Sequence, residues 1–326
     1  MSESDATCPG HEIPGMATHH MQKIAGYLDR KFPGAGSTAS YRSELLRVCS
    51  DFSASDFSDT KYGRELTSGE EGKFWSCVSE ALIFDKLRNQ LTPRNSDGSG
   101  PDFLLRFGKK KVWLEVICPE PVGLPDEWLN PRPNTVVDFP HEAILLRWTS
   151  AIKDKAERLI GREGERTRGY LQSGAVSLDD IYVIAVNGCR LRSGPFSAFD
   201  GISQFPHAVE AVLPVGPQQL RIDRCTRATM SRGYQERFHI AKPNGANVPT
   251  FAFLDSRYAP VSAIWAVDFN GGGIVGHSEP SALVHNPNAS QPLPLGFFPA
   301  DAEFVATPYG VGEFLLERHA QGKDDC

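Results

Sequence analysis

Residues 100–121, GPDFLLRFGKKKVWLEVICPEP, contain two short apolar segments joined by a turn, and two carboxylates interrupt the apolar pattern. The segments 101–107 and 111–119 are each typical of a strand, and the connecting GKKK predicts a tight, solvated hairpin. Asp102 opens the first strand, and Glu115 lies in the middle of the second. Burying a charge at such a position is unfavourable unless a partner compensates for it.

The second strand is apolar on both faces except at Glu115, which predicts that it lies inside the sheet. Because side chains alternate along a strand, Val112, Leu114 and Val116 share one face, and Trp113, Glu115 and Ile117 share the other. The hairpin would bring Asp102 beside Glu115. Two neighbouring carboxylates repel each other, and a divalent cation is the simplest group that neutralises both.

The surrounding pattern predicts an α/β fold. Helices are expected over 19–32, 40–48, 68–87 and 141–160, and a buried strand over 181–188. A loop with five prolines, 119–133, separates the hairpin from the last of these helices. The order helix, strand, strand, helix, strand indicates a mixed central sheet covered by helices.

We expect three regions along the chain: a helical, partly flexible N-terminal extension (1–68), an α/β core (69–190) and a β-rich C-terminal part (191–326). In the last region, 250–255, 261–269 and 303–310 are predicted strands that either extend the central sheet or form a small lobe on it. The glycines of 269–276 lack the context of a phosphate-binding loop, so a hairpin is expected there.

Two predicted helices also carry a charged residue within an otherwise apolar face, as the strands do. Glu80 interrupts the apolar stripe of the first long helix, and Lys155 interrupts that of the second. Three acids and one lysine therefore break the apolar faces of four elements that should pack together. Carboxylate oxygens favour Mg²⁺ or Mn²⁺, which can activate water and stabilise the charge on a phosphorus under attack. The pattern indicates metal-assisted phosphodiester hydrolysis.

The stretch resembles the PD-(D/E)xK nuclease superfamily, whose core is a helix, three strands, a helix and a strand. Pro101-Asp102 matches the "PD", Glu115 the "(D/E)", and Glu80 the acid often found on the first helix. The resemblance implies a restriction-endonuclease-like α/β/α core over about residues 70–190. It also implies metal binding by Asp102, Glu115 and Glu80.

One position departs from the family pattern, because Ile117 stands where the motif lysine is expected. In some members this lysine has moved to the following helix, and Lys155 is similar to that arrangement. Lys153, on the neighbouring face, is a weaker candidate. The departure motivates an alternative function, that of a nuclease-fold module without catalysis that recognises nucleic acid or protein.

Each residue also has a purely structural interpretation. Asp102 could cap a turn after Pro101, and Glu115 could form an ion pair with Lys155 that satisfies both groups without catalysis. Glu80 could be a solvated helix acid, and the stem of Lys155 could extend along the surface to water.

Basic residues cluster in two places that suit a phosphate backbone. The first follows the helix 141–160 and comprises Arg158, Arg162, Arg166 and Arg168; the second comprises Arg221, Arg224, Arg227, Arg232 and Arg237, with Tyr234 and Phe238 interleaved. A solvated helical face is the alternative interpretation. We expect a nucleic-acid partner, DNA rather than RNA, and a homodimer would suit double-strand cutting.

The composition excludes several other classes. The chain has 326 residues, 40% hydrophobic and 23% charged, with a net charge of −6, which excludes a fully disordered chain and an overall basic protein. Its seven scattered cysteines contain no C-x-x-C pair, so reduced thiols are expected rather than a disulfide framework or a zinc ribbon. No membrane span or leader is recognised, and we expect a cytoplasmic protein.

Overall fold

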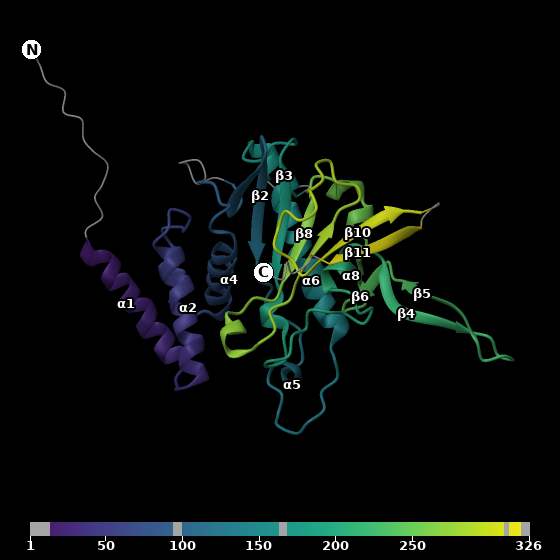
Figure 1. Ribbon diagram of the computed structural model, residues 1–326, viewed down its shortest axis with the longest axis horizontal. Coiled ribbons are helices and arrows are strands. Elements are labelled where there is room, and N and C mark those ends of the chain that lie inside the picture. The colour runs from purple at the N-terminus through teal and green to yellow at the C-terminus, as the bar shows by residue number, and fades with distance from the viewer. Residues whose placement is uncertain (1–13, 94–99, 163–167, 310–312, 321–326) are drawn as a thin grey trace, which may run out of the picture.

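The computed structural model describes residues 14–93, 100–162, 168–309 and 313–320, and Figure 1 shows the arrangement of their elements. The α-helices are α1 (Pro14–Lys31), α2 (Ser37–Ser53), α3 (Tyr62–Leu66), α4 (Glu71–Leu87), α5 (Asp126–Leu129), α6 (His141–Ile160), α7 (Tyr170–Ser173) and α8 (His207–Val212). Short 3₁₀ helices cover Gly188–Leu191, Ala252–Leu254, Ser256–Tyr258 and Gly272–Val275. No helix among the described residues is long and apolar enough to cross a membrane.

A seven-stranded mixed sheet forms the centre of the molecule, in the order β1-β2-β3-β8-β9-β10-β11. Its strands are β1 (Phe103–Phe107), β2 (Lys110–Ile117), β3 (Ile181–Asn187), β8 (Ala263–Val267), β9 (Ser281–His285), β10 (Ala302–Pro308) and β11 (Phe314–Ala320). Two separate ribbons are formed by β4 (Val215–Ile222) with β5 (Thr229–Glu236), and by β6 (His239–Ala241) with β7 (Asn247–Pro249). The predicted α/β class with a mixed central sheet is therefore confirmed.

The predicted hairpin forms, and its register places the two acids of the motif at neighbouring positions. β1 and β2 pair antiparallel, with Phe103 opposite Leu114 and Phe107 opposite Lys110. Gly108 adopts a φ of 58°, which a residue without a Cβ accepts without strain. Asp102 directly precedes β1, so one further step of the same register brings it beside Glu115.

Before β1 the chain makes one more sheet contact. The backbone N–H of Thr92 donates to the carbonyl of Leu104 at 2.7 Å, and the two residues form an isolated antiparallel bridge. From β2 the chain continues through α6 into β3, which pairs parallel with β2. The predicted helix 141–160 coincides with α6, and the predicted strand 181–188 with β3.

The C-terminal strands β8 to β11 extend the central sheet beyond β3. The predicted strands 261–269 and 303–310 contain β8 and most of β10. The predicted strand 250–255 is wrong, because Ala252–Leu254 forms a 3₁₀ helix. Its Phe253 is fully buried in the hydrophobic cluster that contains α6 and α8. The apolar residues of this segment therefore contribute to the core from a short helix and do not pair with a strand of the sheet.

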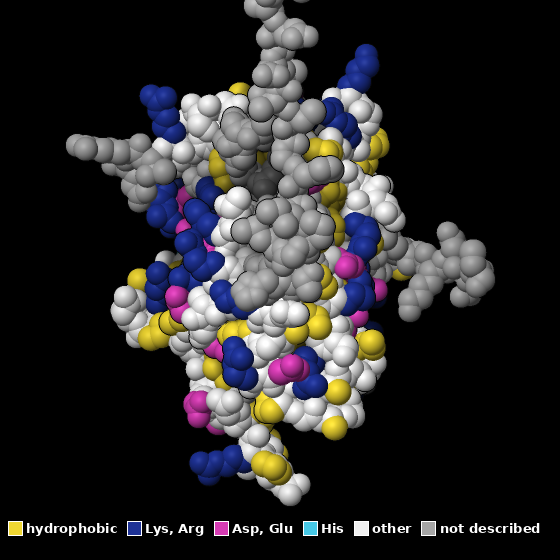
Figure 2. All heavy atoms as spheres, turned by 90° about the vertical axis from the view of Figure 1, so that its left-hand side faces the viewer, with side chains coloured by type: hydrophobic (Ala, Val, Ile, Leu, Met, Phe, Trp, Pro, Cys, Tyr) yellow, Lys and Arg dark blue, Asp and Glu magenta, His cyan; other side chains and the backbone are white. Residues whose placement is uncertain are grey.

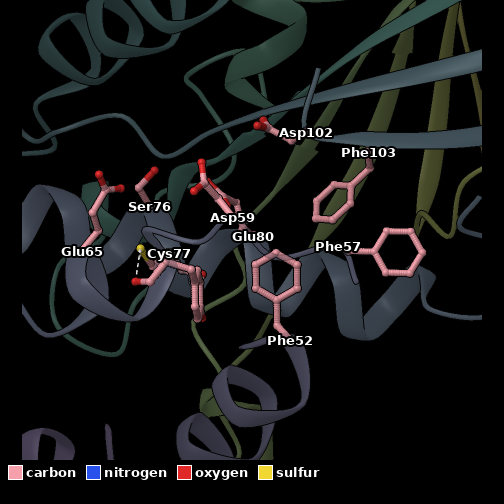
Figure 3. A pocket seen from close by; sticks show the side chains of 10 residues that line it. Phe52, Phe57, Asp59, Glu65, Ser76, Cys77, Glu80, Asp102 and Phe103 are labelled. Carbon is pink, nitrogen blue, oxygen red and sulfur yellow. Dashed lines mark hydrogen bonds between the residues drawn. The ribbon is translucent and has the colours of Figure 1, made fainter. Parts of the chain in front are cut away.

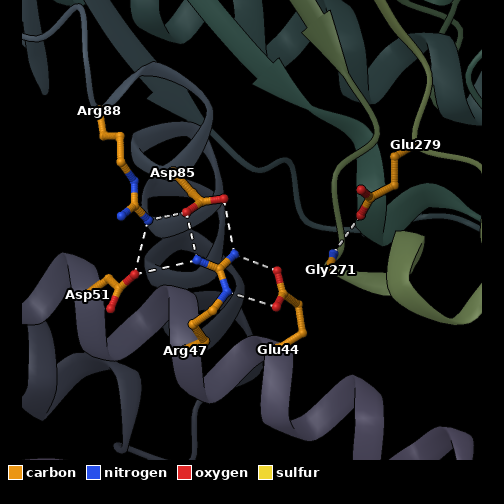
Figure 4. Close-up of polar contacts among 7 residues, drawn as sticks. All are labelled: Glu44, Arg47, Asp51, Asp85, Arg88, Gly271 and Glu279. Atoms are coloured by element: carbon orange, nitrogen blue, oxygen red, sulfur yellow. Dashed lines mark hydrogen bonds and ion pairs between the residues drawn. The ribbon is translucent and has the colours of Figure 1, made fainter.

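The glycine-rich segment 269–276 is not a hairpin. Gly272–Val275 forms a 3₁₀ helix between Gly271 and Gly276, whose φ angles of 78° and 86° are left-handed. Glu279 accepts a hydrogen bond from the backbone N–H of Asn270 at 2.9 Å and another from that of Gly271 at 2.7 Å, of which Figure 4 shows the second.

Two hydrophobic clusters lie on opposite faces of the sheet, so the fold has three layers. One cluster joins the sheet to α6 and α8, with Trp148 and Leu159 at 1% exposure or less. The other joins it to α2, α3 and α4, and includes Leu45, Phe52 and Phe74. The helices of the predicted N-terminal extension therefore complete one face of the core.

Charged residues reinforce the contact between α2 and α4. The Arg47 guanidinium contacts Glu44, Asp51 and Asp85, and Arg88 contacts Asp51 and Asp85 (Figure 4). Both basic and acidic side chains are visible on the face that the N-terminal helices present in Figure 2.

Candidate functional site

The carboxylate of Glu115 is fully buried and satisfied by two cations and a hydroxyl. Lys155 Nζ donates to Glu115 Oε1 at 2.7 Å, Arg158 Nη1 lies 3.1 Å from the same oxygen, and the Tyr170 hydroxyl donates to Oε2 at 3.3 Å. Lys155 is 12% exposed, whereas Arg158 is 56% exposed. The ion pair between Glu115 and Lys155, one of the structural interpretations of the sequence, is thus present.

Asp102 lies at the entrance to β1 and uses one oxygen to hold the neighbouring strand. Its Oδ2 accepts a hydrogen bond from the backbone N–H of Val116 at 2.7 Å. Burial, and next the negative charge of Asp102, raise the pKa of Glu115, while Lys155 and Arg158 act in the opposite direction. The two acids are therefore close enough to interact, and the two cations do not fully cancel the cost of the buried charge.

Glu80 and Asp102 line one acidic pocket of about 130 Å³ between α3, α4 and the start of β1 (Figure 3). Its carboxylates come from Asp59, Glu65, Glu80 and Asp102. Phe52, Phe57 and Phe103 form its apolar side, and its described lining contains no lysine or arginine. The helix face that carries Glu80 therefore turns toward the beginning of the "PD" strand.

The three predicted metal ligands do not form a closed cage. Glu115 does not line the pocket that Glu80 and Asp102 share, since its oxygens face α6 and Tyr170. Within the described part of the chain, no three His, Cys, Asp or Glu side chains gather in an arrangement that could hold a metal ion. The structure brings Asp102 near each of the other two acids but does not bring all three to one point.

The remaining predicted residues are placed as follows. Lys153 is 63% exposed and lies 3.6 Å from Glu157, away from Glu115. Arg162 pairs with Asp154 and Glu157 on the surface of α6, and Arg168 is exposed. Arg166 lies outside the described residues. Of this first basic cluster, Arg158 thus contacts the site itself.

The second basic cluster does not form a helical face. The ribbon of β4 and β5 extends away from the body of the molecule (Figure 1), and most of its residues are exposed. Arg221 and Arg232 lie on its strands, and Arg224 and Arg227 at its turn. None of these four arginines has an ion pair within the described residues.

Sequence reasoning placed Arg158 in a basic cluster without pairing it with Glu115, and it missed Tyr170. Arg158 lies one helical turn after Lys155, so the i, i+3 spacing on α6 could have identified it as a second partner of Glu115. Tyr170 gave no signal, because it reaches the site from the separate short helix α7. Burial, and next the charge of Glu115, raise the pKa of Tyr170, so its hydroxyl stays protonated and donates.

Comparison of the chain with protein-family models, with curated proteins and with solved structures finds no match.

Proposed function

We propose that the protein is a divalent-metal-dependent nuclease that hydrolyses phosphodiester bonds at the centre formed by Asp102, Glu115 and Lys155. The observation that carries the proposal is their convergence from three elements. Asp102 contacts the backbone of β2 beside Glu115, and Lys155 of α6 donates to Glu115 at 2.7 Å. A buried acid in the middle of a strand, held by a lysine from the next helix, fits the displaced lysine of the resemblance.

The order of elements supports the same proposal. α4, the bridge at Thr92, β1, β2, α6 and β3 follow one another along the chain. If the bridge counts as a shortened first strand, this is the superfamily order of a helix, three strands, a helix and a strand. Pro101-Asp102 then begins the second strand and Glu115 lies in the third.

The donor set fits a hard cation such as Mg²⁺ or Mn²⁺. Asp102 and Glu80 offer carboxylate oxygens in one pocket, and burial raises the pKa of Glu115, so a further positive charge would stabilise its ionised form. Mg²⁺ is commonly held by one or two carboxylates together with water and substrate phosphates, so a protein cage of three ligands is not required. When bound, the ion would lower the pKa of water and stabilise charge on the phosphate.

The residues of the chain then have separate roles. Asp102 and Glu115 would hold the cation, and Glu80, which shares the acidic pocket with Asp102, would reach it through a bound water. Lys155, fixed by its hydrogen bond to Glu115, would orient the attacking water or donate to the phosphate oxygens as charge develops on them. Arg158 is half exposed and points its charge to the same carboxylate, so it can contact a phosphate that approaches from solvent.

A cleavage assay tests the proposal. Single- and double-stranded DNA and RNA are incubated with the protein in Mg²⁺, in Mn²⁺ and in EDTA. We expect cleavage of DNA with either metal, loss of cleavage in EDTA, and recovery when excess Mg²⁺ is restored. Cleavage that persists in EDTA would contradict the metal dependence.

Replacing Lys155 tests the displaced lysine. Lys155→Met should lower the cleavage rate by roughly a hundredfold, the typical effect of removing one preorganised donor. Adding Ile117→Lys should restore part of the rate, because positions 115 and 117 share one face of β2. Steady-state kinetics on duplex DNA measure both effects.

Lys153→Met is the matched control, since Lys153 lies on the same helix but is largely exposed and away from Glu115. It should leave the rate within about twofold of wild type. Equal losses at Lys153 and Lys155 would show that α6 acts only through its surface charge.

A module without catalysis is the second candidate function. Ile117 occupies the motif position, and Lys155, Arg158 and Tyr170 already satisfy both oxygens of Glu115. Such a site could be an ion pair that only stabilises the core. DNA binding without cleavage of any substrate, in either metal, would favour this candidate.

The ribbon of β4 and β5 offers a contact for duplex DNA in both cases. A two-stranded ribbon fits the major groove, and unpaired arginines release counterions when they bind phosphates. We expect Arg221→Gln with Arg232→Gln to weaken duplex binding roughly tenfold at 0.1 M salt, and to lower the salt dependence by about one ion for each arginine. Fluorescence anisotropy measures both quantities.

Arg64→Gln serves as the control, because Arg64 is exposed on α3, away from the ribbon. Equal affinities of all three proteins would exclude the ribbon as a DNA contact.

A further inference from the structure

Two thiols meet at the ends of two neighbouring parallel strands. Cys118 directly follows β2, and Cys189 lies in the 3₁₀ turn that follows β3. Their Sγ atoms are 3.8 Å apart, although the residues are separated by 71 positions in the sequence. The distance corresponds to van der Waals contact, and both residues are free cysteines.

The two cysteine residues differ in their exposure. Cys118 is half-buried and lines an open depression of about 300 Å³, together with residues of α6 such as Arg147 and Asp154. Cys189 is buried behind it at 7% exposure. Of the two cysteines, Cys118 therefore lines the depression, and Cys189 lies in contact with it on the buried side.

The surroundings favour the anionic form of the outer thiol. The hydrogen bond from Cys189 lowers the pKa of Cys118; burial opposes this effect, and Ser79 and the positive charge of Arg190 add to it. Burial, and next the contact with Cys118, raise the pKa of Cys189 well above its usual range. Arg190 Nη1 is buried and has no hydrogen-bond acceptor in the described structure. The pair thus has one partner suited to attack and one that holds its proton.

We propose that Cys118 and Cys189 form a site of reversible oxidation, at which a peroxide converts the two thiols into a disulfide. The site is separate from the proposed nuclease function and does not depend on it.

The reaction has two steps. The Cys118 thiolate attacks one oxygen of the peroxide, so that an S–O bond forms, the O–O bond breaks and hydroxide leaves. The Cys189 sulfur then attacks the Cys118 sulfur: the S–S bond forms, the S–O bond breaks, and the departing hydroxide takes the thiol proton as water. Two thiols lose two electrons and two protons, and hydrogen peroxide becomes two molecules of water.

Only a small movement is needed. A disulfide bond is about 2.05 Å long, so the sulfur atoms must approach by somewhat less than 2 Å. Both cysteines lie beyond the hydrogen-bonded strands, where rotation of the side chains does not break the sheet. A bond between them would tie the end of β2, three residues after Glu115, to the turn after β3.

The other described cysteines lack this arrangement. Burial raises the pKa of Cys49 to about 12 and that of Cys77 even further. Cys225 is exposed at the turn of the ribbon, and no hydrogen bond of its sulfur to another thiol is found among the described residues. It is therefore an internal reference for a reachable thiol without a partner.

The full-length protein is reduced, freed of reductant and titrated with hydrogen peroxide, and the products are mapped by peptide mass spectrometry without reduction. We expect one linked peptide pair containing Cys118 and Cys189, lost on treatment with dithiothreitol. The apparent Tm should rise by roughly 5 °C or more when the bond forms, because it closes a long loop. Cys189→Ser should instead leave Cys118 as a sulfenic acid that dimedone traps.

Cys225→Ser is the matched control and should form the same linked pair to the same extent. Cys118 oxidised to sulfinic acid without linkage to Cys189 would overturn the proposal. So would two thiols that remain reduced at a peroxide concentration that oxidises Cys225. Because the readout is covalent, the result is the same whether or not the protein cleaves nucleic acid.

Discussion

Asp102→Asn is expected to lower the Mg²⁺-dependent cleavage rate by at least roughly a hundredfold, because the change removes a charge that would hold the proposed cation. The amide oxygen can still accept the hydrogen bond that Asp102 receives from Val116 at 2.7 Å, so the hairpin should keep its register. The free energy of unfolding should therefore change by less than about 1 kcal/mol. Single-turnover cleavage kinetics and urea unfolding measure the two effects separately.

Asp59→Asn provides the matched control. Asp59 lines the same acidic pocket, yet its Oδ1 accepts from the backbone N–H of Lys61 as part of a local turn. It should retain at least about half of the wild-type rate. If both variants cleave as fast as wild type, the pocket has no part in catalysis.

Replacing Glu210 should have the largest effect on stability. This carboxylate is fully buried, and it accepts hydrogen bonds from His141, Ser203 and Arg237. Glu210→Gln should cost about 3–5 kcal/mol at pH 7, because it leaves the nearly buried Arg237 without its counter-charge. Urea unfolding at neutral pH measures this loss.

The same cluster should make the protein sensitive to acid. Burial alone would raise the pKa of Glu210, but hydrogen bonds from His141 and Ser203 lower it to about 2. Since this folded pKa lies below the usual value of 4.5, the carboxylate stabilises the fold above pH 4.5, and this contribution is lost as the pH falls toward 2. The contribution is on the order of 3 kcal/mol.

His207 acts in a neighbouring pH window. Burial lowers its pKa to about 4, against 6.5 for an ordinary histidine. Between these values the unfolded chain takes up a proton that the folded chain does not, so stability falls as the pH drops from 6.5 to 4. We expect wild-type stability to decline through both windows.

Glu210→Gln should abolish the decline between pH 4.5 and 2 and keep the one between 6.5 and 4. Asp179→Asn, a change at an exposed loop acid, should reproduce the wild-type profile within about 0.5 kcal/mol. A wild-type profile that stays flat from pH 6.5 to 3 would contradict this account of the cluster.

The sequence predicted those features in which a polar residue breaks an apolar pattern inside a regular element. Glu115 could be recognised because a strand that is apolar on both faces has no exposed side for a charge. Lys155 could be recognised because it interrupts the stripe of α6. Their pairing follows from the packing of α6 against β2.

Other features depend on contacts that a local pattern does not contain. Tyr170 reaches Glu115 from a short helix, and within the strand predicted at 250–255 the residues Ala252–Leu254 form a 3₁₀ helix in which Phe253 is buried. The N-terminal helices were expected as an extension, and their packing against α4 and the sheet is a contact that their local pattern does not contain.

The central claim is that Asp102 and Glu115 share a divalent cation beside Lys155. A crystal structure of the protein with Mn²⁺ and a DNA that resists hydrolysis, with an anomalous difference map at the manganese edge, tests it most directly. The account predicts a manganese peak at about 2.1 Å from carboxylate oxygens of both Asp102 and Glu115. It also predicts Lys155 within hydrogen-bond distance of the scissile phosphate or of a metal-bound water. A peak elsewhere, or DNA bound with no peak and Glu115 paired with Lys155 and Arg158 alone, would contradict it.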